Sequence, residues 1–183
     1  MLKNFLPLYI KYDIMSLYRC EVSLMEDKVC SFSGHRQISK SHTETLPILL
    51  SDTVDTLIDS GVKTFQSGGA LGFDLLAAGL VLAKRAKSPD IRLKMVLPCR
   101  DQAARWPKKF QRAYENIISS ADEVLYLGEI YDQFCMQRRN RHLVDSADIL
   151  LCYLTRSFGG TMSTVNYAYD KELQIINLAT LLK

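Results

Sequence analysis

Three glycine-rich turns are the places where this chain could hold an anion. The first reads Ser33-Gly34-His35-Arg36, the second runs from Gly68 to Asp74, and the third runs from Ser157 to Thr164. Glycines let backbone N–H groups approach an anion closely, and a helix N-terminus adds partial positive charge. The bland alternative is that these glycines only turn the chain. A single glycine-rich turn would favour neither a phosphate site nor a simple change of chain direction, but three such turns at one edge of a sheet favour a phosphate site.

A basic cluster, Arg138-Arg139-Asn140-Arg141, could complete such a site. On a helix, Arg139 shares a face with the apolar Leu143, so we expect Arg139 to point toward the sheet. A guanidinium there could clamp a phosphate through two N–H groups. We interpret Arg138 and Arg141 as a solvated helix face.

Three further side chains could act in acid–base chemistry or in binding. His35 follows a strand, where it is either a hydrogen-bonded turn residue or a direct ligand contact. Asp74 and Asp145 are candidate catalytic carboxylates. Asp74 stands at the start of a predicted helix, so we favour a role in holding its loop over a role as a base.

Short apolar runs alternate with helical patterns and would position these residues. Strands are expected at 29–32, 62–66, 91–97, 123–127, 149–154 and 174–178, and helices at about 46–58, 73–87, 102–120, 132–146 and 161–171. Ser41 and Glu44 have capping-box spacing before the first helix. This alternation predicts a Rossmann-like α/β fold, an open and mainly parallel sheet of about six strands with helices on both faces. Such sheets bind ligands at the carboxyl ends of their strands.

Composition excludes several classes of protein. The chain has 183 residues, a net charge of +3, 48% hydrophobic and 23% charged residues, which suits one ordinary globular domain. The charge is too small to indicate nucleic acid, and no apolar run reaches the roughly 20 residues of a membrane span. Five cysteines lack metal spacing and favour a reducing, cytoplasmic compartment. We expect no metal and no cofactor. Residues 1–25 are interpreted as an appendage and residues 26–183 as the domain.

The ordered motifs resemble the SLOG superfamily, a Rossmann-like group that includes the Lonely-Guy phosphoribohydrolases and the Smf/DprA proteins, and within it the YpsA-like branch. The resemblance covers about residues 28–178. It is carried by 32–36, by Gly68-Gly69-Ala70-x-Gly72-x-Asp74, by Trp106 and Tyr114, by Arg139-Asn140-x-x-Leu143-Val144-Asp145, and by Gly159-Gly160-Thr161-x-x-Thr164-x-Asn166-Tyr167-Ala168.

The resemblance implies a nucleotide site and also a departure from hydrolytic chemistry. Met136-Gln137-Arg138-Arg139 is similar to the Met-x-x-Arg segment of Lonely-Guy enzymes, which places Arg139 on their arginine. Asn166 stands where those enzymes carry a glutamate, and an amide does not take a proton from water. From the turns, the cluster and the resemblance together, the predicted ligand-binding residues are Gly34, His35, Arg36, Gly68, Gly69, Gly72, Asp74, Arg139, Asn140, Ser157, Gly159, Gly160, Thr161, Ser163, Thr164 and Asn166.

Three functions are therefore open. The first is a regulatory module that binds a nucleotide or nucleotide derivative without catalysis and signals to a protein partner, and it is the one we favour. The second is an N-glycosidase that cleaves nucleoside monophosphates with Asp74 or Asp145. The third, binding of single-stranded DNA, needs a basic track with stacking aromatics, and the weak charge gives it little support. The family resemblance alone makes a homodimer plausible.

Overall fold

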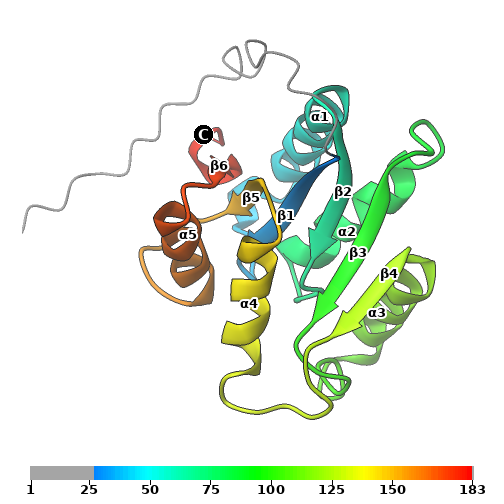
Figure 1. Ribbon diagram of the computed structural model, residues 1–183, viewed down its shortest axis with the longest axis vertical. Coiled ribbons are helices and arrows are strands. Elements are labelled where there is room, and N and C mark those ends of the chain that lie inside the picture. The colour runs from blue at the N-terminus through cyan, green and yellow to red at the C-terminus, as the bar shows by residue number, and fades with distance from the viewer. Residues whose placement is uncertain (1–26, 183) are drawn as a thin grey trace, which may run out of the picture.

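A computed structural model of the protein describes residues 27–182 (Figure 1). The predicted N-terminal appendage, 1–25, lies outside the described residues. Strands and helices alternate along the described chain. The strands are β1 Lys28–Gly34, β2 Val62–Ser67, β3 Arg92–Leu97, β4 Glu123–Tyr126, β5 Ile149–Tyr153 and β6 Gln174–Asn177. The helices are α1 Thr45–Asp59, α2 Phe73–Lys84, α3 Lys108–Ser120, α4 Cys135–Asp145 and α5 Gly160–Asp170, with short 3₁₀ turns η2 at Lys40–His42 and η3 at Leu178–Thr180.

The six strands form one parallel sheet in the order β4-β3-β2-β1-β5-β6. The chain moves outward from β1 to β4, then crosses back to place β5 on the other side of β1. The two directions of winding diverge between β1 and β5, which is the topological switch point where open α/β sheets leave a crevice. The predicted Rossmann-like fold is confirmed.

Helices cover both faces of the sheet, and the alternation of side chains along β5 shows how. Leu151 and Tyr153 belong to a large core cluster shared with α1, α2 and α3. Leu150 and Cys152, which point the other way because a strand alternates its faces, belong to a smaller cluster with α4 and α5. In Figure 1, α4 and α5 lie in front of the sheet, with α1 to α3 behind it.

Two helix starts differ from the prediction. The capping box is wrong, because Glu44 is itself in helical conformation at the N-cap of α1 and makes no side-chain cap bond, and Ser41 lies in η2. The third helix begins at Lys108 instead of near Gln102, with Pro107 at its N-cap. A proline disfavours helical backbone in the residue before it, so the segment 101–106 forms turns and the helix starts only after the proline.

Candidate functional site

A cavity of about 340 Å³ lies at the carboxyl ends of β1 and β5, at the switch point of the sheet. We call it the β1–β5 cavity. The end of β1, the turn after it, the start of α2, one face of α4 and the first residues of α5 form its walls. Its lining residues are Phe32, Ser33, Gly34, His35, Arg36, Ala70, Asp74, Met136, Arg139, Asn140, Leu143, Gly160 and Thr161.

Arg139 and Asp74 form a buried ion pair in the wall of this cavity. Arg139 Nη1 lies 3.2 Å from Asp74 Oδ2, and the two residues are 6% and 3% exposed. The Gly34 amide donates to Asp74 Oδ1 at 3.1 Å. Burial raises the pKa of Asp74, while Arg139 and the Gly34 and Ala70 amides oppose that rise. Asp74 therefore holds Arg139 and the turn after β1 in place.

The Arg139 guanidinium keeps donors that Asp74 does not use. Its Nε is buried without a hydrogen-bond partner among the described residues. Among residues 27–182 the one hydrogen-bond partner of its Nη2 is the Met136 sulfur, at 3.8 Å, which is a weak acceptor. A buried, unpartnered donor on a cation favours an anionic ligand, because unmade charge-assisted bonds are costly.

Gly68 leaves the space in which the guanidinium lies. A Cβ at this position would be 1.2 Å from Arg139 Nη1 and 2.3 Å from its Cζ. Gly72 serves the neighbouring turn: its φ is +85°, and a Cβ there would lie 2.3 Å from the Arg36 carbonyl oxygen. The second glycine turn thus works by close packing behind the cavity, although neither glycine lines it.

His35 ties the turn after β1 to the turn after β5. Its Nε2 accepts a hydrogen bond from the Thr155 amide at 3.0 Å, and its own amide donates to the Tyr153 carbonyl at 3.3 Å. Burial and the nearby Arg156 lower the pKa of His35. An imidazole whose Nε2 accepts a hydrogen bond is neutral, so this hydrogen bond and the lowered pKa both favour the neutral form of His35.

The third turn contributes the N-terminus of α5. Gly159 has a φ of +95°, and Gly160 and Thr161 line the cavity. The first amides of a helix have no partner within it. The hydroxyls of Ser163 and Thr164 bond back to the Gly159 and Gly160 carbonyls, at 3.2 and 2.8 Å. These hydroxyls therefore stabilise the first turn of α5, and Ser157 is exposed.

Other predicted residues lie away from the cavity. Asp145 ends α4 just before β5 begins, at the amino edge of the sheet, where it accepts from Tyr167 Oη at 2.8 Å and pairs with Lys171 at 3.7 Å. Asn166 is exposed on α5. Gly69 packs between Tyr114 and β3, in that a Cβ there would lie 3.0 Å from Met95 and Leu97.

The neighbours of Arg139 on the helix have separate roles. Arg138 pairs with Asp132 at 2.5 Å, and Arg141 lies over the Tyr167 ring, 5.7 Å from its centroid. Both are exposed. Asn140 lines the cavity beside Gly160.

Sequence reasoning missed several residues of the site. Five lining residues are absent from the predicted binding residues, although the motifs quoted from the sequence contain them: Phe32, Ser33, Ala70, Met136 and Leu143. Gln102 donates from Nε2 to the Gly68 and Gly69 carbonyls, at 3.4 and 2.8 Å, and so fixes the second glycine turn from behind. Nothing in the local sequence marks Gln102 for this role.

Two negative findings apply to residues 27–182. No helix there is long and apolar enough to cross a bilayer. The same residues contain no group of three or more histidine, cysteine or acidic side chains that could hold a metal ion.

Comparison with solved structures agrees with the fold. DNA processing protein A of Streptococcus pneumoniae matches with a TM-score of 0.60 and 18% identity, over 81% of this chain and 49% of that one. The Helicobacter pylori protein of the same name, whose single-stranded DNA binding mode has been described, matches with a TM-score of 0.59 and 21% identity, over 81% and 65%.

Sequence relatives cover part of the chain. The SPbeta prophage-derived protein YoqJ of Bacillus subtilis is 27% identical over 116 residues, 57% of this chain and 68% of YoqJ. A UPF0398 protein of Bacillus licheniformis is 25% identical over 114 residues, 61% of this chain and 62% of that protein. Matched regions in another relative, the UPF0398 protein of Halalkalibacterium halodurans, span about half of each chain at 32% identity.

The YpsA family model, described as the YspA SLOG family, matches residues 34–177. This range includes the turn after β1, both other glycine turns, Asp74 and Arg139. It covers well over half of the sequence, so the chain belongs to the YspA SLOG family.

Proposed function

We propose that the protein binds a nucleotide or nucleotide-derived small molecule in the β1–β5 cavity and does so without catalysis. The observation that carries the proposal is the buried Arg139, whose Nε has no partner among the described residues, in the same cavity as the N-terminus of α5. A helix N-terminus and a guanidinium are both preferred partners of phosphate. The apolar Phe32, Ala70 and Leu143 in the same walls suit the rest of a nucleotide.

The charge balance limits how many phosphates the cavity favours. Arg36 and Arg139 line it, and Asp74 offsets one of these charges. One phosphate next to Arg139 and the α5 amides is therefore better supported than a triphosphate. We further propose that occupancy is signalled to a protein partner in the cytoplasm, with a homodimer as the resting form.

Hydrolysis of an N-glycosidic bond has less support. It needs a carboxylate that can activate water and stabilise charge growing on the ribose. Asp74 already pairs with Arg139 and accepts a hydrogen bond from the Gly34 amide. Asp145 lies at the opposite edge of the sheet. Asn166, exposed on α5, is neutral.

Calorimetry with nucleoside mono-, di- and triphosphates, and with an oligo(dT) strand, tests the proposal. The wild type should bind at least one nucleotide, and ligand at 100 times its dissociation constant should stabilise the fold by about 2.7 kcal/mol. The oligo(dT) arm covers the binding described for the Helicobacter pylori neighbour. If the protein binds oligo(dT) but no nucleotide, a nucleic-acid function replaces the proposal. If it binds none of these molecules, the proposal is wrong.

Three arginine variants locate the site. Arg139→Ala should weaken nucleotide binding by about 1.5–3 kcal/mol, the cost of a lost charge-assisted contact. Arg138→Ala and Arg141→Ala are matched controls on the same helix, because both side chains are exposed and engaged elsewhere. Circular dichroism at the temperature of the titration checks that each variant is folded. Equal losses in all three would indicate a diffuse electrostatic surface instead of a clamp.

A further inference from the structure

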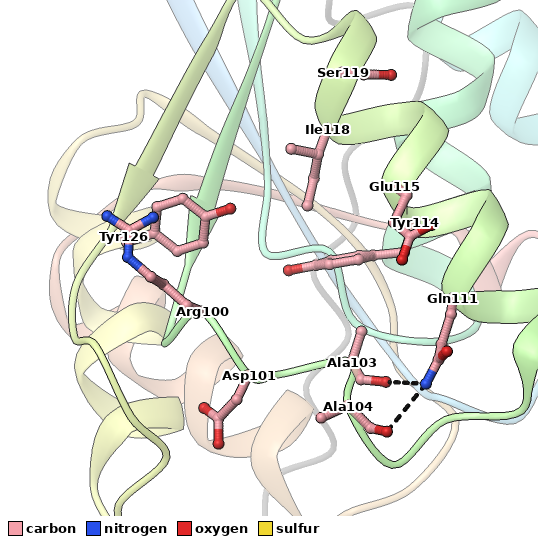
Figure 2. Close-up of a pocket in the computed structure, with 10 residues that line it drawn as sticks. All are labelled: Arg100, Asp101, Ala103, Ala104, Gln111, Tyr114, Glu115, Ile118, Ser119 and Tyr126. Atoms are coloured by element: carbon pink, nitrogen blue, oxygen red, sulfur yellow. Dashed lines mark hydrogen bonds between the residues drawn. The ribbon is translucent and has the colours of Figure 1, made fainter.

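A second cavity, of about 410 Å³, lies beneath α3 near the end of β4 (Figure 2). We call it the α3 cavity. Tyr114 and Ile118 of α3 line it from one side and Tyr126 of β4 from the other, with the loop after β3 below. Gln111 Nε2 donates to the Ala103 and Ala104 carbonyls, both at 3.0 Å, and so holds that loop against the helix. The loop after β3 is therefore tied to α3 at one wall of the cavity.

Tyr114 supplies an unused polar group inside the α3 cavity. The residue is 4% exposed, and its hydroxyl has no hydrogen-bond partner among the described residues. In Figure 2 the Tyr114 ring extends from α3 across the cavity, and the hydroxyls of Tyr114 and Tyr126 point into the space between the two rings. Burial raises the pKa of Tyr114, so the hydroxyl keeps its proton and can donate. Leaving such a group unpaired is costly, and a ligand that pairs with it recovers that cost.

The charges around the α3 cavity disfavour an anion. Arg100 is paired with Glu129 at 2.7 Å and lies over the Tyr126 ring, 4.4 Å from its centroid. Asp101 and Glu115 place carboxylates at the same rim. Because Glu129 offsets Arg100, the carboxylates of Asp101 and Glu115 make this rim net negative, and it therefore discriminates against phosphate, unlike the β1–β5 cavity. A phosphate-free molecule with several donors and acceptors suits such a rim.

We propose that the α3 cavity binds a neutral, planar heteroaromatic ring of the nucleobase type. The face of Tyr114, Ile118 and Ala103 would contact the ring, and the Tyr114 hydroxyl would bond to a ring nitrogen or carbonyl on its edge. Stacking on aromatic side chains is a common way of holding bases and tolerates different rings. The volume lies within the range of small-molecule sites. The proposal stands independently of ligand binding in the β1–β5 cavity.

The fluorescence of a tryptophan next to this site can report binding. Trp106 is the single tryptophan in the sequence, and its ring contacts the Tyr114 ring edge to face with 5.2 Å between centroids. A ring bound against Tyr114 should change Trp106 fluorescence. Titration of the full chain with adenine, hypoxanthine and uracil, which carry no phosphate, should give a saturable change with at least one of them. No saturable change with any of the three would overturn the proposal.

A pair of conservative variants tests the hydrogen bond. Tyr114→Phe keeps the ring beside Trp106 and removes only the orphaned hydroxyl, so binding should weaken by about 3- to 10-fold. Tyr169→Phe, at an exposed position on α5, is the matched control and should bind like the wild type. Equal affinity of Tyr114→Phe and wild type would overturn the assignment.

Discussion

Gly68→Ala should destabilise this protein by displacing Arg139 from its buried ion pair with Asp74. The new Cβ would occupy the place of the Arg139 guanidinium, 1.2 Å from Nη1. Gly68 has no positive φ, so alanine does not strain the backbone. The arginine must leave, and Asp74 stays buried without its partner. Breaking a buried ion pair costs about 3–5 kcal/mol, and the reduced freedom of the unfolded chain offsets about 0.4–1 kcal/mol of it. We expect a net loss of about 2–4.5 kcal/mol in the free energy of unfolding.

Urea denaturation followed by circular dichroism measures this loss. Gly79→Ala is the matched control, because it is a helical glycine in α2 with nothing within 4 Å of its Cβ position. It should stabilise the protein by about 0.5–1 kcal/mol. The cause is isolated by repeating Gly68→Ala in an Arg139→Ala background, where the clash is gone and the cost should fall to below about 1 kcal/mol. An unchanged cost in that background, or a Gly68→Ala protein as stable as wild type, would refute the reasoning.

Two further predictions concern pH and catalysis. The pKa of His35 is lowered in the folded state, so the unfolded chain takes up a proton more readily as pH falls through about 6.5, and folded stability drops there. His35→Gln removes that term, so the stability advantage of the wild type over His35→Gln should be full at pH 7.5 and smaller at pH 5.5; an advantage that does not change between these pH values would contradict this. Chromatography should detect no enzyme-dependent free base from nucleoside monophosphates, whereas base release that Asp74→Asn abolishes would favour the hydrolase.

The fold and the orientation of Arg139 could be predicted from local patterns, whereas the contacts of the site could not. The helical spacing of Arg139 and Leu143 indicated that both point toward the sheet, and both are buried, at 6% and 1% exposure. The partner of Arg139 is Asp74, 65 residues away, and no local period reports a contact over that distance. The role of Gly68 depends on the same contact.

The position of Asp145, away from the cavity, could have been predicted from the direction of its helix. A helix that follows a parallel strand begins at the carboxyl edge of the sheet and runs back to the amino edge. The first turns of α4, with Met136 and Arg139, therefore lie at the cavity, and its last residue lies at the other end. Helix direction alone therefore places Arg139 at the cavity and Asp145 at the opposite edge of the sheet.

The two hydrophobic clusters differ in size, so the β1–β5 cavity lies between two parts of the protein whose local unfolding requires different free energies. One wall rests on the large cluster beneath α1 to α3, and the other on the smaller cluster of Val144, Leu150, Cys152, Val165, Ala168 and Ile175 beneath α4 and α5. Amide protons in α4 and α5 are expected to exchange with solvent through local openings before those of β1 and β2. Such an opening separates Arg139 from Asp74, so anything that bridges the cavity slows exchange in these two helices first.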